Sequence, residues 1–491
     1  MVGVSGVSSR MFSALSKENI NVILITQASS EHSICIAIAP TQLEAAVKQL
    51  NIEFALEIKA KVLQPIISEK GFSIISVVGR DMHNYPGVAG QIFKALGTNG
   101  VNLSAIAQGS SELSISVVVK DTDEIKALKT IHAEFFYSQN GIINVFLIGV
   151  GLIGKELLLQ LSKHARALKE KHAHDIKIIG LANTKHQYFS HDGINPETAL
   201  EDLKENGENY NIESFVDKMI DINLYHSVFV DCTASEEVGK QYFKILDSSI
   251  AVITPNKKAM SGPIEEYKKI KAAHKRRRVD FLYETNVGAG LPIISTLTDL
   301  LKSGDSLIKI EAVLSGTLSY IFNSFVKDTS FSEIVIQARE SGYTEPDPRD
   351  DLNGMDVARK ILILAREIGL ELELSDIEIE SLIPDSCKDA KNVEEFLSLL
   401  KEADGFFSDQ LEGALAKNSR LSYIASLVDG KAKVKLEIIN SNHPFYNLSG
   451  SDNIIALTTR RYKECPLVVR GPGAGAEVTA AGVFADIIRI G

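Results

Sequence analysis

The sequence contains no tryptophan, and it has only four cysteines in 491 residues. The cysteines lie far apart, at Cys35, Cys232, Cys387 and Cys465, and no two have the spacing of a metal site. So few cysteines in so long a chain exclude a disulfide scaffold and fit a reducing compartment. We therefore expect the protein to be cytoplasmic.

The sequence also lacks long apolar runs and an excess of positive charge. No segment approaches the roughly 18 apolar residues that cross a bilayer, and no signal-peptide pattern is found. The net charge is −11, so the chain lacks the broad positive field that drives nucleic-acid binding. The basic cluster Lys275 to Arg278 is expected to be the solvated end of a helix. Neither a membrane nor a nucleic acid is predicted as a partner.

Enough apolar sequence is present for several domains. Hydrophobic residues make up 45% of the chain and charged residues 23%, which is ordinary globular composition. A length of 491 residues suggests about three domains.

An internal repeat occupies the first 140 residues. The segments 11–38 and 92–119 align at a constant offset of 81, so that ITQASSEHS corresponds to IAQGSSELS. Each repeat predicts a helix, a strand, a turn and another strand. The strand FSIISVVG (72–79) precedes the second repeat, whereas its counterpart in the first would lie before Met1. We expect the first repeat to be truncated; a diverged repeat that never had this strand is the alternative.

These paired β-α-β units resemble ACT regulatory domains of the aspartokinase type. The resemblance implies that Gln27 and Gln108 bind an effector amino acid, because a side-chain amide both donates and accepts hydrogen bonds. Without the resemblance, capping of the strand ends is the favoured interpretation of these glutamines.

A dinucleotide-binding pattern follows the repeat. The segment INVFLIGVGLIGKELLLQL (143–161) predicts a buried strand, a glycine-rich turn and an amphipathic helix. Gly149 is expected to permit the turn, Gly151 to admit the pyrophosphate, and Gly154 to let the helix pack on the strand. Leu152 and Ile153 lie between these glycines and are expected to approach the cofactor.

The next strand, within DIKIIGLANTK (175–185), carries the cofactor preference. It ends in Asn183, Thr184 and Lys185, without the carboxylate that usually binds an NAD ribose. NADP(H) is therefore predicted, with NAD(H) as the alternative. Thr233 ends a further strand (226–235) and is predicted at the same edge. Its neighbour Cys232 has no adjacent histidine, so a small buried residue is favoured over a nucleophile.

Motifs in the second half of the chain are similar to homoserine dehydrogenase: TPNKKA (254–259), FLYETNVGAGLPI (281–293), SGTLSYIF (315–322), GYTEPDPRDDLNGMDVARK (342–360) and RGPGAG (470–475). Together with the ACT pair they resemble the C-terminal part of the bifunctional aspartokinase–homoserine dehydrogenase family over essentially the whole chain. The resemblance implies reversible NAD(P)H-dependent reduction of L-aspartate 4-semialdehyde to L-homoserine, in threonine and methionine biosynthesis. No kinase segment is recognised, so aspartokinase activity is not expected from this chain.

The same resemblance assigns the site residues. Lys360 is implied as general acid, Lys257 as the lysine beside substrate and nicotinamide, and Asp351 as support for proton transfer. The remaining implied contacts are Glu345, Asp356, Tyr343 and Thr317 for the substrate and Gly342 and Gly475 for the cofactor. By spacing alone, Asp356 and Lys360 (i, i+4) also fit an ion pair on a helix surface.

The turn YETNVGAGLP (283–292) is implied to bind a monovalent cation, Na⁺ or K⁺. Its ligands are expected to be largely backbone carbonyls, from Glu284, Val287, Ala289 and Leu291, because such ions prefer oxygen. A glycine hinge is the alternative. The family also implies a homodimer and L-threonine as effector, with sensitivity weakened if the first repeat is truncated.

The predicted architecture is multidomain, α/β and α+β. Tandem ACT repeats (βαββαβ type) are expected at 1–140, a Rossmann domain at 141–283 and an α+β catalytic and dimerisation domain at 284–464. The segment 465–491 is expected to return to the nucleotide-binding domain. Two other classes stay open: a phosphorylating semialdehyde dehydrogenase with a cysteine nucleophile, and a noncatalytic amino-acid sensor built on the ACT repeats.

Overall fold

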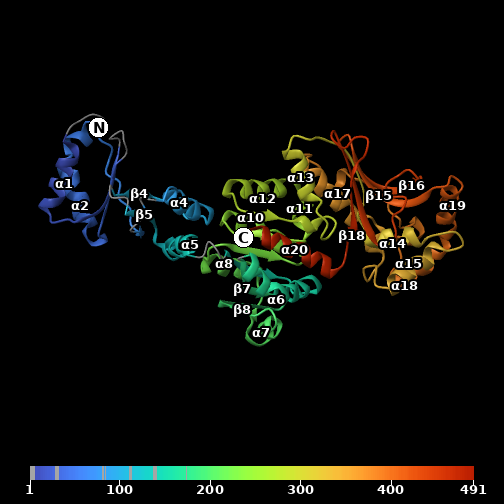
Figure 1. The fold of residues 1–491 in the computed structure, drawn as a ribbon. Coiled ribbons are helices and arrows are strands. Elements are labelled where there is room, and N and C mark those ends of the chain that lie inside the picture. The colour runs from blue at the N-terminus through green and yellow to red at the C-terminus, as the bar shows by residue number, and fades with distance from the viewer. Residues whose placement is uncertain are drawn as a thin grey trace. The chain divides into compact units, whose positions relative to one another are not determined.

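The computed structural model describes residues 6–27, 33–79, 82, 85–109, 113–136, 141–172 and 174–490. The chain divides into two compact units, one of residues 1–139 with 223–225 and one of residues 140–222 with 226–491. Figure 1 labels the helices and strands of both. Among the described residues, no helix is both long and apolar enough to cross a membrane.

The first unit repeats one order of elements. Its first copy contains α1 (Val7–Lys17), β1 (Val22–Gln27), β2 (Ile34–Ile38), η1 (Pro40–Gln42), α2 (Leu43–Glu53) and α3 (Ala55–Lys59). Its second contains β3 (Phe72–Val78), α4 (Val88–Thr98), β4 (Ala105–Gln108), β5 (Ser114–Lys120), η3 (Asp121–Asp123) and α5 (Glu124–Phe136). Helices α1 and α4 begin at Val7 and Val88, so the offset of 81 is kept in three dimensions.

The strands of this unit pair antiparallel. In the described part of the chain β1 pairs with β2, and a second sheet has the order β3-β5-β4. The strand predicted at 72–79 is β3. Gln27 and Gln108 end equivalent strands, pairing with Ile34 and Ile115. The matching triplets Ser29–Glu31 and Ser110–Glu112 lie outside the described residues.

Each repeat has a second helix that the sequence pattern did not predict. Helix α2 contributes Ala46 and Leu50 to the core that α1 lines with Leu15. Helix α5 does the same beside α4, through Ala127 and Ile131. Both helices of each repeat thus add apolar side chains to the core, because the apolar face of a sheet must be buried against other elements.

A nucleotide-binding sheet opens the second unit. Its described strands are ordered β12-β11-β10-β6-β7-β8-β9. They are β6 (Gly141–Ile148), β7 (His174–Ala182), β8 (His186–Ile194), β9 (Glu208–Asn209), β10 (Ser227–Asp231), β11 (Ala251–Ile253) and β12 (Phe281–Leu282). The predicted strands run parallel, whereas β8 and β9 add an antiparallel edge that no apolar run signalled.

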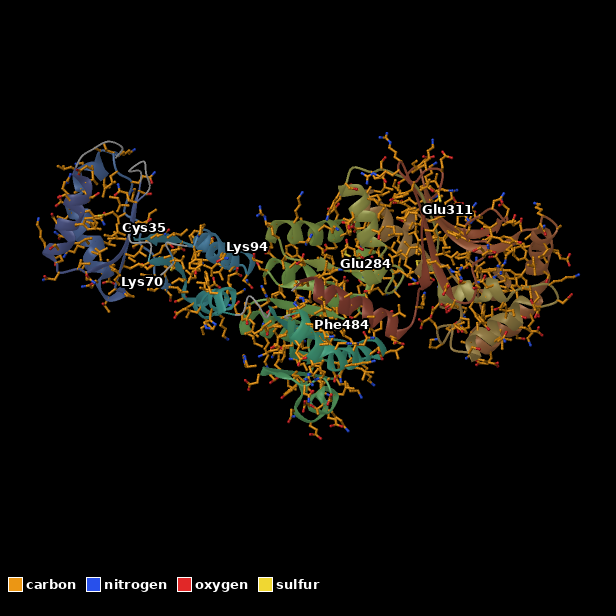
Figure 2. The ribbon with its side chains drawn as sticks, viewed as in Figure 1. Cys35, Lys70, Lys94, Glu284, Glu311 and Phe484 are labelled. Atoms are coloured by element: carbon orange, nitrogen blue, oxygen red, sulfur yellow. The ribbon has the colours of Figure 1, made fainter. Side chains whose placement is uncertain are left out.

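Helices cover this sheet, and the last helix of the chain joins them. They are α6 (Leu152–His172), α7 (Ala199–Asn206), α8 (Ile212–Ile222), α9 (Glu236–Gly239), α10 (Tyr242–Asp247), α11 (Lys257–Met260), α12 (Ile264–Arg277) and α20 (Ala476–Ile490). Gln160 Nε2 on α6 donates to Glu477 O at 3.0 Å, and the rings of His164 and Phe484 stack at 6.0 Å. Figure 2 labels Phe484 on α20. The C-terminus thus returns to the nucleotide-binding helix α6.

A second sheet supports the other half of this unit. Its described strands follow the order β14-β16-β15-β13-β17-β18. They are β13 (Leu307–Val313), β14 (Glu378–Ile379), β15 (Arg420–Val428), β16 (Lys431–Ile439), β17 (Asp452–Thr459) and β18 (Leu467–Pro472). Around it lie α13 (Ile294–Lys302), α14 (Gly316–Ser324), α15 (Phe331–Glu340), α16 (Arg349–Leu352), α17 (Met355–Glu367), α18 (Val393–Glu402) and α19 (Asp404–Leu415). Successive residues of β15 are buried, so both of its faces are covered.

Candidate active site

The glycine-rich turn joins β6 to α6. Gly149 has φ +90°, and a Cβ there would lie 2.8 Å from the Cys232 carbonyl carbon. A Cβ on Gly154 would lie 2.2 Å from Gly149 O. Gly151 has no atom within 4 Å of a built Cβ. The fold itself therefore requires Gly149 and Gly154, whereas Gly151 leaves an open approach for a ligand.

The end of β7 presents donors rather than carboxylates. Asn183 Oδ1 accepts from the backbone N–H groups of Lys185 and His186, both at 2.7 Å. Its oxygen is thus used within the turn, and its NH₂ group is what remains to meet a ligand. Thr184 and Lys185 are exposed. This edge suits an anionic group better than a ribose hydroxyl that needs an acceptor.

A buried carboxylate at the end of β10 organises the neighbouring loops. Asp231 accepts from Thr233 N at 2.7 Å, Tyr242 Oη at 2.5 Å and Asn256 Nδ2 at 2.9 Å. Burial raises the pKa of Asp231, against the lowering effect of these hydrogen bonds. Asn256 is the N-cap of α11, which begins with Lys257. Asp231 was not predicted as a site residue. The sequence feature that could have identified it is a single acidic residue at the end of an apolar strand.

Two lysines share one carboxylate. Lys360 Nζ lies 2.8 Å from Asp356 Oδ2, and Lys257 Nζ lies 3.4 Å from Asp356 Oδ1. Lys360 also donates to Leu314 O at 2.6 Å, and its side chain is only 10% exposed. Asp356 lies in the first turn of α17, where the helix dipole favours a negative charge. The structure thus brings Lys257 to the predicted Asp356–Lys360 pair from 99 positions earlier in the chain than Asp356.

The charges of this cluster set its proton affinities. Burial lowers the pKa of Lys360, and the positive charge of Lys257 lowers it further, against Asp356 and Asp351. Burial acts to raise the pKa of Asp356, but the two ammonium groups bring it well below its usual range. The cluster therefore holds an ionised carboxylate beside a lysine that gives up its proton more easily than a surface lysine.

The acidic loop before α17 is fastened to α14. Asp351 accepts from Glu345 N at 2.8 Å, and Thr317 Oγ1 donates to Tyr343 O at 2.6 Å. The Tyr343 ring stacks on Tyr320 at 4.2 Å. Burial raises the pKa of Asp351, while hydrogen bonds from Glu345 and Thr317 lower it. Hydrogen bonds thus connect Tyr343 to Thr317 of α14 and Glu345 to Asp351 of α16, and the Glu345 side chain is exposed.

The other residues of this loop and of the C-terminal turn have simpler surroundings. Arg349 pairs with Asp347 at 2.6 Å. Gly342 has φ +74° and Gly475 has φ +118°, and neither has an atom within 4 Å of a built Cβ. Their predicted approach to the cofactor stays a prediction.

The turn after β12 has the features of a carbonyl site. The Glu284 carboxylate accepts from Ile293 N and Ile294 N at 2.6 Å each, which caps α13. Its side chain is therefore occupied, and its backbone carbonyl is the predicted ligand. Gly288 and Ala289 both have positive φ, +80° and +52°. The described residues contain no cluster of three or more His, Cys, Asp or Glu that fits a metal.

Helix α20 closes over the same turn. A Cβ on Gly482 would lie 2.4 Å from Thr285 Cγ2, so the backbones pack closely. Arg489 Nη1 lies 2.8 Å from Asp486 Oδ1 and 3.6 Å from Glu284 Oε2. Burial raises the pKa of Asp486 to about 6. Asp486 and Arg489 were not predicted, because nothing local distinguishes them from other charges on a helix.

Three family models match the chain. The model for homoserine dehydrogenase matches residues 292–488, and its NAD-binding domain matches residues 149–284. The ACT domain matches residues 1–54 and 75–135. The predicted ACT, nucleotide-binding and catalytic regions are thereby confirmed; the boundaries at 140, 283 and 464 stay predictions.

Curated relatives and a solved structure agree with these matches. "Bifunctional aspartokinase/homoserine dehydrogenase 1, chloroplastic" of Arabidopsis thaliana is 45% identical over all of this chain and 54% of its own length. Homoserine dehydrogenase of Schizosaccharomyces pombe is 43% identical over 71% of this chain and 95% of its own. A Candida auris crystal structure of unknown function is 35% identical with TM-score 0.66, over 71% of this chain and 98% of its own.

The chain spans about half the length of the bifunctional relatives that it matches. It covers almost the whole of the fission-yeast protein. The plant relative is named as chloroplastic, and the cytoplasmic location of this chain stays a prediction.

Proposed function

We propose, from the premise that this chain belongs to the homoserine dehydrogenase family, that it interconverts L-aspartate 4-semialdehyde and L-homoserine with NAD(P)H. The observation that carries the proposal is one ionised carboxylate, Asp356, shared by Lys257 and the buried Lys360. The test is NADPH oxidation with aspartate 4-semialdehyde and, in reverse, NADP⁺ reduction with homoserine. Absence of turnover in both directions by folded protein would reject it.

When bound, the nicotinamide would supply a hydride to the aldehyde carbon. The carbonyl oxygen then becomes an alkoxide, which takes a proton from Lys360 to give the alcohol; in reverse Lys360 removes that proton. Lys257 places a positive charge beside the same oxygen and stabilises the charge that develops on it. Asp351 is proposed to support this proton transfer.

The other end of the substrate carries an ammonium group. Glu345 is proposed to bind it, because its side chain is exposed on the loop that Asp351 and Thr317 fasten. Asp356 is proposed to contribute as well. Its 3.4 Å contact with Lys257 is loose enough for a substrate ammonium to replace. Tyr343 and Thr317 are proposed to border the same space.

The cofactor is proposed to be NADP(H), held by the glycine turn, the Asn183–Lys185 turn, Thr233, Gly342 and Gly475. Lys185→Ala is expected to lower kcat/KM for NADPH by about tenfold, since one charge-assisted hydrogen bond to the 2′-phosphate is lost. The same variant assayed with NADH is the control, and its kcat/KM should hardly change. Equal losses with both cofactors would contradict the assignment.

A monovalent cation is proposed in the turn of Glu284, Val287, Ala289 and Leu291. Gly288 and Ala289 both have left-handed backbone conformations, and the Glu284 side chain is occupied in capping α13. Both features fit a site made of backbone carbonyls. Thr285 Oγ1 and Asn286 Oδ1 are buried beside it without a hydrogen-bond partner among the described residues. The ion's chemistry is structural: it would tie the turn to the start of α13.

We propose that Cys232 is not a catalytic nucleophile. Burial raises the pKa of its thiol, so it is not poised to attack a carbonyl as a thiolate. Cys232→Ala is expected to keep kcat within about twofold, because a half-buried small residue is replaced by a slightly smaller one. Steady-state NADPH oxidation checks this. Loss of turnover in a folded Cys232→Ala protein would revive the alternative.

L-Threonine is proposed as an effector of the ACT repeats, and a homodimer as the assembly. Gln27 and Gln108 end equivalent strands, and both side chains are exposed to a ligand. If threonine slows NADPH oxidation, Gln108→Ala is expected to raise the half-inhibitory concentration by about tenfold, the effect of one lost hydrogen bond in a polar site. Threonine inhibition that is unchanged in both Gln27→Ala and Gln108→Ala would contradict these contacts.

A further inference from the structure

The two lysines of the site come from helices on different sheets. Lys257 begins α11, directly after strand β11 of the nucleotide-binding sheet. Lys360 lies on α17, which packs on β15 and β16 of the other sheet. Their common partner Asp356 is 47% exposed, and an exposed ion pair at 3.4 Å fixes little. The separation of the lysines therefore depends on what joins α11 to α17.

Arg366 connects α11 to α17. It lies six residues after Lys360 on α17, and its side chain is 0% exposed. Its Nη1 donates to Met260 O at 2.9 Å and to Gly262 O at 2.8 Å. Met260 is the last residue of α11. Nε and Nη2 donate to Leu372 O, so the rigid guanidinium fork is fixed on the side of α17 as well.

Burying this cation is costly. Its ion-pair partner Glu373 lies at 3.2 Å and is 41% exposed, and burial lowers the pKa of Arg366. The guanidinium also lies 5.2 Å from the centre of the Tyr267 ring. An apolar side chain of similar size often gives equal or better stability in such a place. We therefore attribute the presence of a buried arginine at this position to the backbone carbonyls that it holds in place, rather than to packing.

Neighbouring contacts fasten the same segment. Arg359 Nη1 on α17 donates to Ser261 Oγ at 3.0 Å, and Ser261 Oγ donates to Lys257 O at 2.8 Å. Glu373 Oε1 accepts from Ile264 N at 2.9 Å. The residues from the end of α11 to the start of α12 are therefore bound to α17 and the turn after it.

The other end of α11 is bound to the nucleotide-binding sheet. Asn256, its N-cap, donates through Nδ2 to Asp231 Oδ2 at 2.9 Å and to Ser235 O at 2.8 Å. Lys257 therefore lies on a four-residue helix that is fixed at both ends by buried or half-buried polar contacts. Arg366 binds the last residue of this helix directly and, with the Arg359–Ser261 contact, relates it to the helix carrying Lys360.

We infer that Arg366 is a positioning residue: by binding the C-terminal end of α11 to α17, it sets the distance of Lys257 from Asp356 and Lys360. This inference rests on the proposed function for its kinetic consequence. Arg366 itself touches no reacting atom. Its effect reaches the chemistry through Lys257.

The consequence for pH has a definite sign. Lys360 faces Asp356 on its own helix, Lys257 on α11 and Asp351 on α16. The two carboxylates favour its protonated form and Lys257 opposes it. If α11 moves away, Lys360 keeps the carboxylates and loses the positive neighbour, so its pKa rises. In homoserine oxidation Lys360 acts unprotonated, and the rising limb of the rate against pH then moves to higher pH.

The test compares Arg366→Gln and Arg366→Lys with wild type in homoserine oxidation over a range of pH. Arg366→Gln is expected to lower kcat by about 100-fold, the scale of a 1 Å displacement of a catalytic group. Its rising limb should move up by about one pH unit. Arg366→Lys should recover part of kcat and shift the rising limb part of the way back toward its wild-type position. Recovery should be incomplete, because one ammonium group cannot reproduce the hydrogen bonds of the guanidinium fork.

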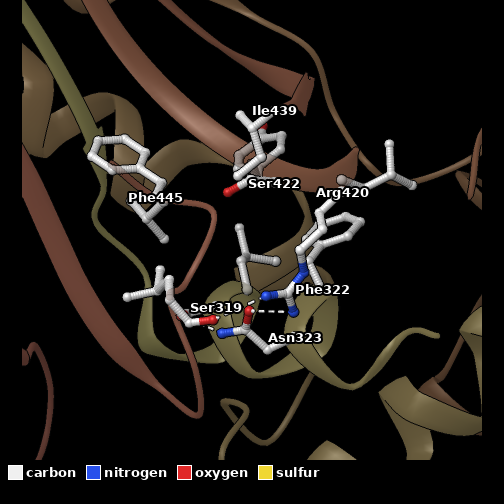
Figure 3. A pocket seen from close by; sticks show the side chains of 12 residues that line it. Ser319, Phe322, Asn323, Arg420, Ser422, Ile439 and Phe445 are labelled. Atoms are coloured by element: carbon white, nitrogen blue, oxygen red, sulfur yellow. Dashed lines mark hydrogen bonds between the residues drawn. The ribbon is translucent and has the colours of Figure 1, made fainter. Parts of the chain in front are cut away.

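Arg420→Gln is the matched control. In the small pocket of Figure 3, Arg420 donates through Nη2 to Asn323 Oδ1 at 3.3 Å. Its Nη1 donates to Tyr446 O at 2.8 Å. These partners belong to neither α11 nor α17. Arg420→Gln should lower Tm as Arg366→Gln does, and it should leave the pH limb in place. An unmoved limb in both Arg366 variants would make Arg366 merely structural and overturn the inference.

A second measurement is independent of turnover. Competitive acetylation of lysines with acetic anhydride across pH, read by peptide mass spectrometry, reports the titration of Lys360 in each protein. We expect the titration of Lys360 to move to higher pH in Arg366→Lys. This variant keeps the positive charge and provides the test if Arg366→Gln does not fold. If wild type proved inactive, the proposed function would fail, while this shift would still support the connection of α11 to α17 through Arg366. An unshifted Lys360 in a folded Arg366→Lys protein would refute it.

Discussion

Replacing Lys360 with alanine is expected to lower kcat for NADPH-dependent reduction of aspartate 4-semialdehyde by about 1,000-fold. General acid–base groups contribute factors of about 100 to 10,000, and this is the buried lysine at the shared carboxylate. Burial and the neighbouring Lys257 charge lower the pKa of Lys360, toward the range in which a lysine both gives and takes a proton. KM for NADPH should change little, since Lys360 is not assigned to the cofactor.

The controls separate chemistry from folding. Lys268→Ala removes an exposed lysine that pairs with Glu371 at 2.8 Å, and it should leave kcat unchanged. Lys360→Arg keeps a positive charge but cannot release its proton near neutral pH, so kcat should stay low. Tm is measured for each variant. A folded Lys360→Ala protein with full turnover would reject the assignment; loss of turnover would reject the noncatalytic sensor.

Gly149→Ala and Gly151→Ala are expected to fail in different ways. At Gly149 the added methyl group meets the backbone of Cys232 and requires φ +90°, so the fold should lose at least about 2 kcal/mol and NADPH binding with it. At Gly151 the methyl group meets open space in the protein, so Tm should stay within a few degrees. The methyl group should instead lower the affinity for NADPH, because it obstructs the approach of the pyrophosphate.

NADPH binding by fluorescence titration and Tm by calorimetry check this pair. Gly151→Ala should raise Kd for NADPH at least about tenfold, which corresponds to about 1.4 kcal/mol. Gly97→Ala, on α4 of the other compact unit, is the matched control, because a Cβ there also meets nothing within 4 Å. Unchanged NADPH affinity in Gly151→Ala would show that the cofactor does not approach this turn as proposed.

Much of the fold followed from local pattern. The 81-residue offset, the strand before the second repeat and the strand–glycine–helix unit are signals within a few turns of chain, and the structure has them as α1 and α4, β3, and β6 with α6. The Asp356–Lys360 pair was also local, since residues four apart share a helix face. By contrast, α2 and α5, and the antiparallel edge β8–β9, had no comparable signal because burial there comes from neighbouring elements.

Within the site, sequence by itself determined the chemical groups: the two lysines, the acidic loop, the glycines and the donor-rich end of β7. Tertiary structure alone decided which of them meet. Lys257 Nζ lies 3.4 Å from Asp356 Oδ1, on a helix, α11, that is bound at one end to Asp231 and at the other to Arg366. The value of each of these charges depends on how far it is buried and on which partner, far away in the chain, faces it. Spacing along the chain does not contain that information, because folding brings such partners together through contacts between distant elements.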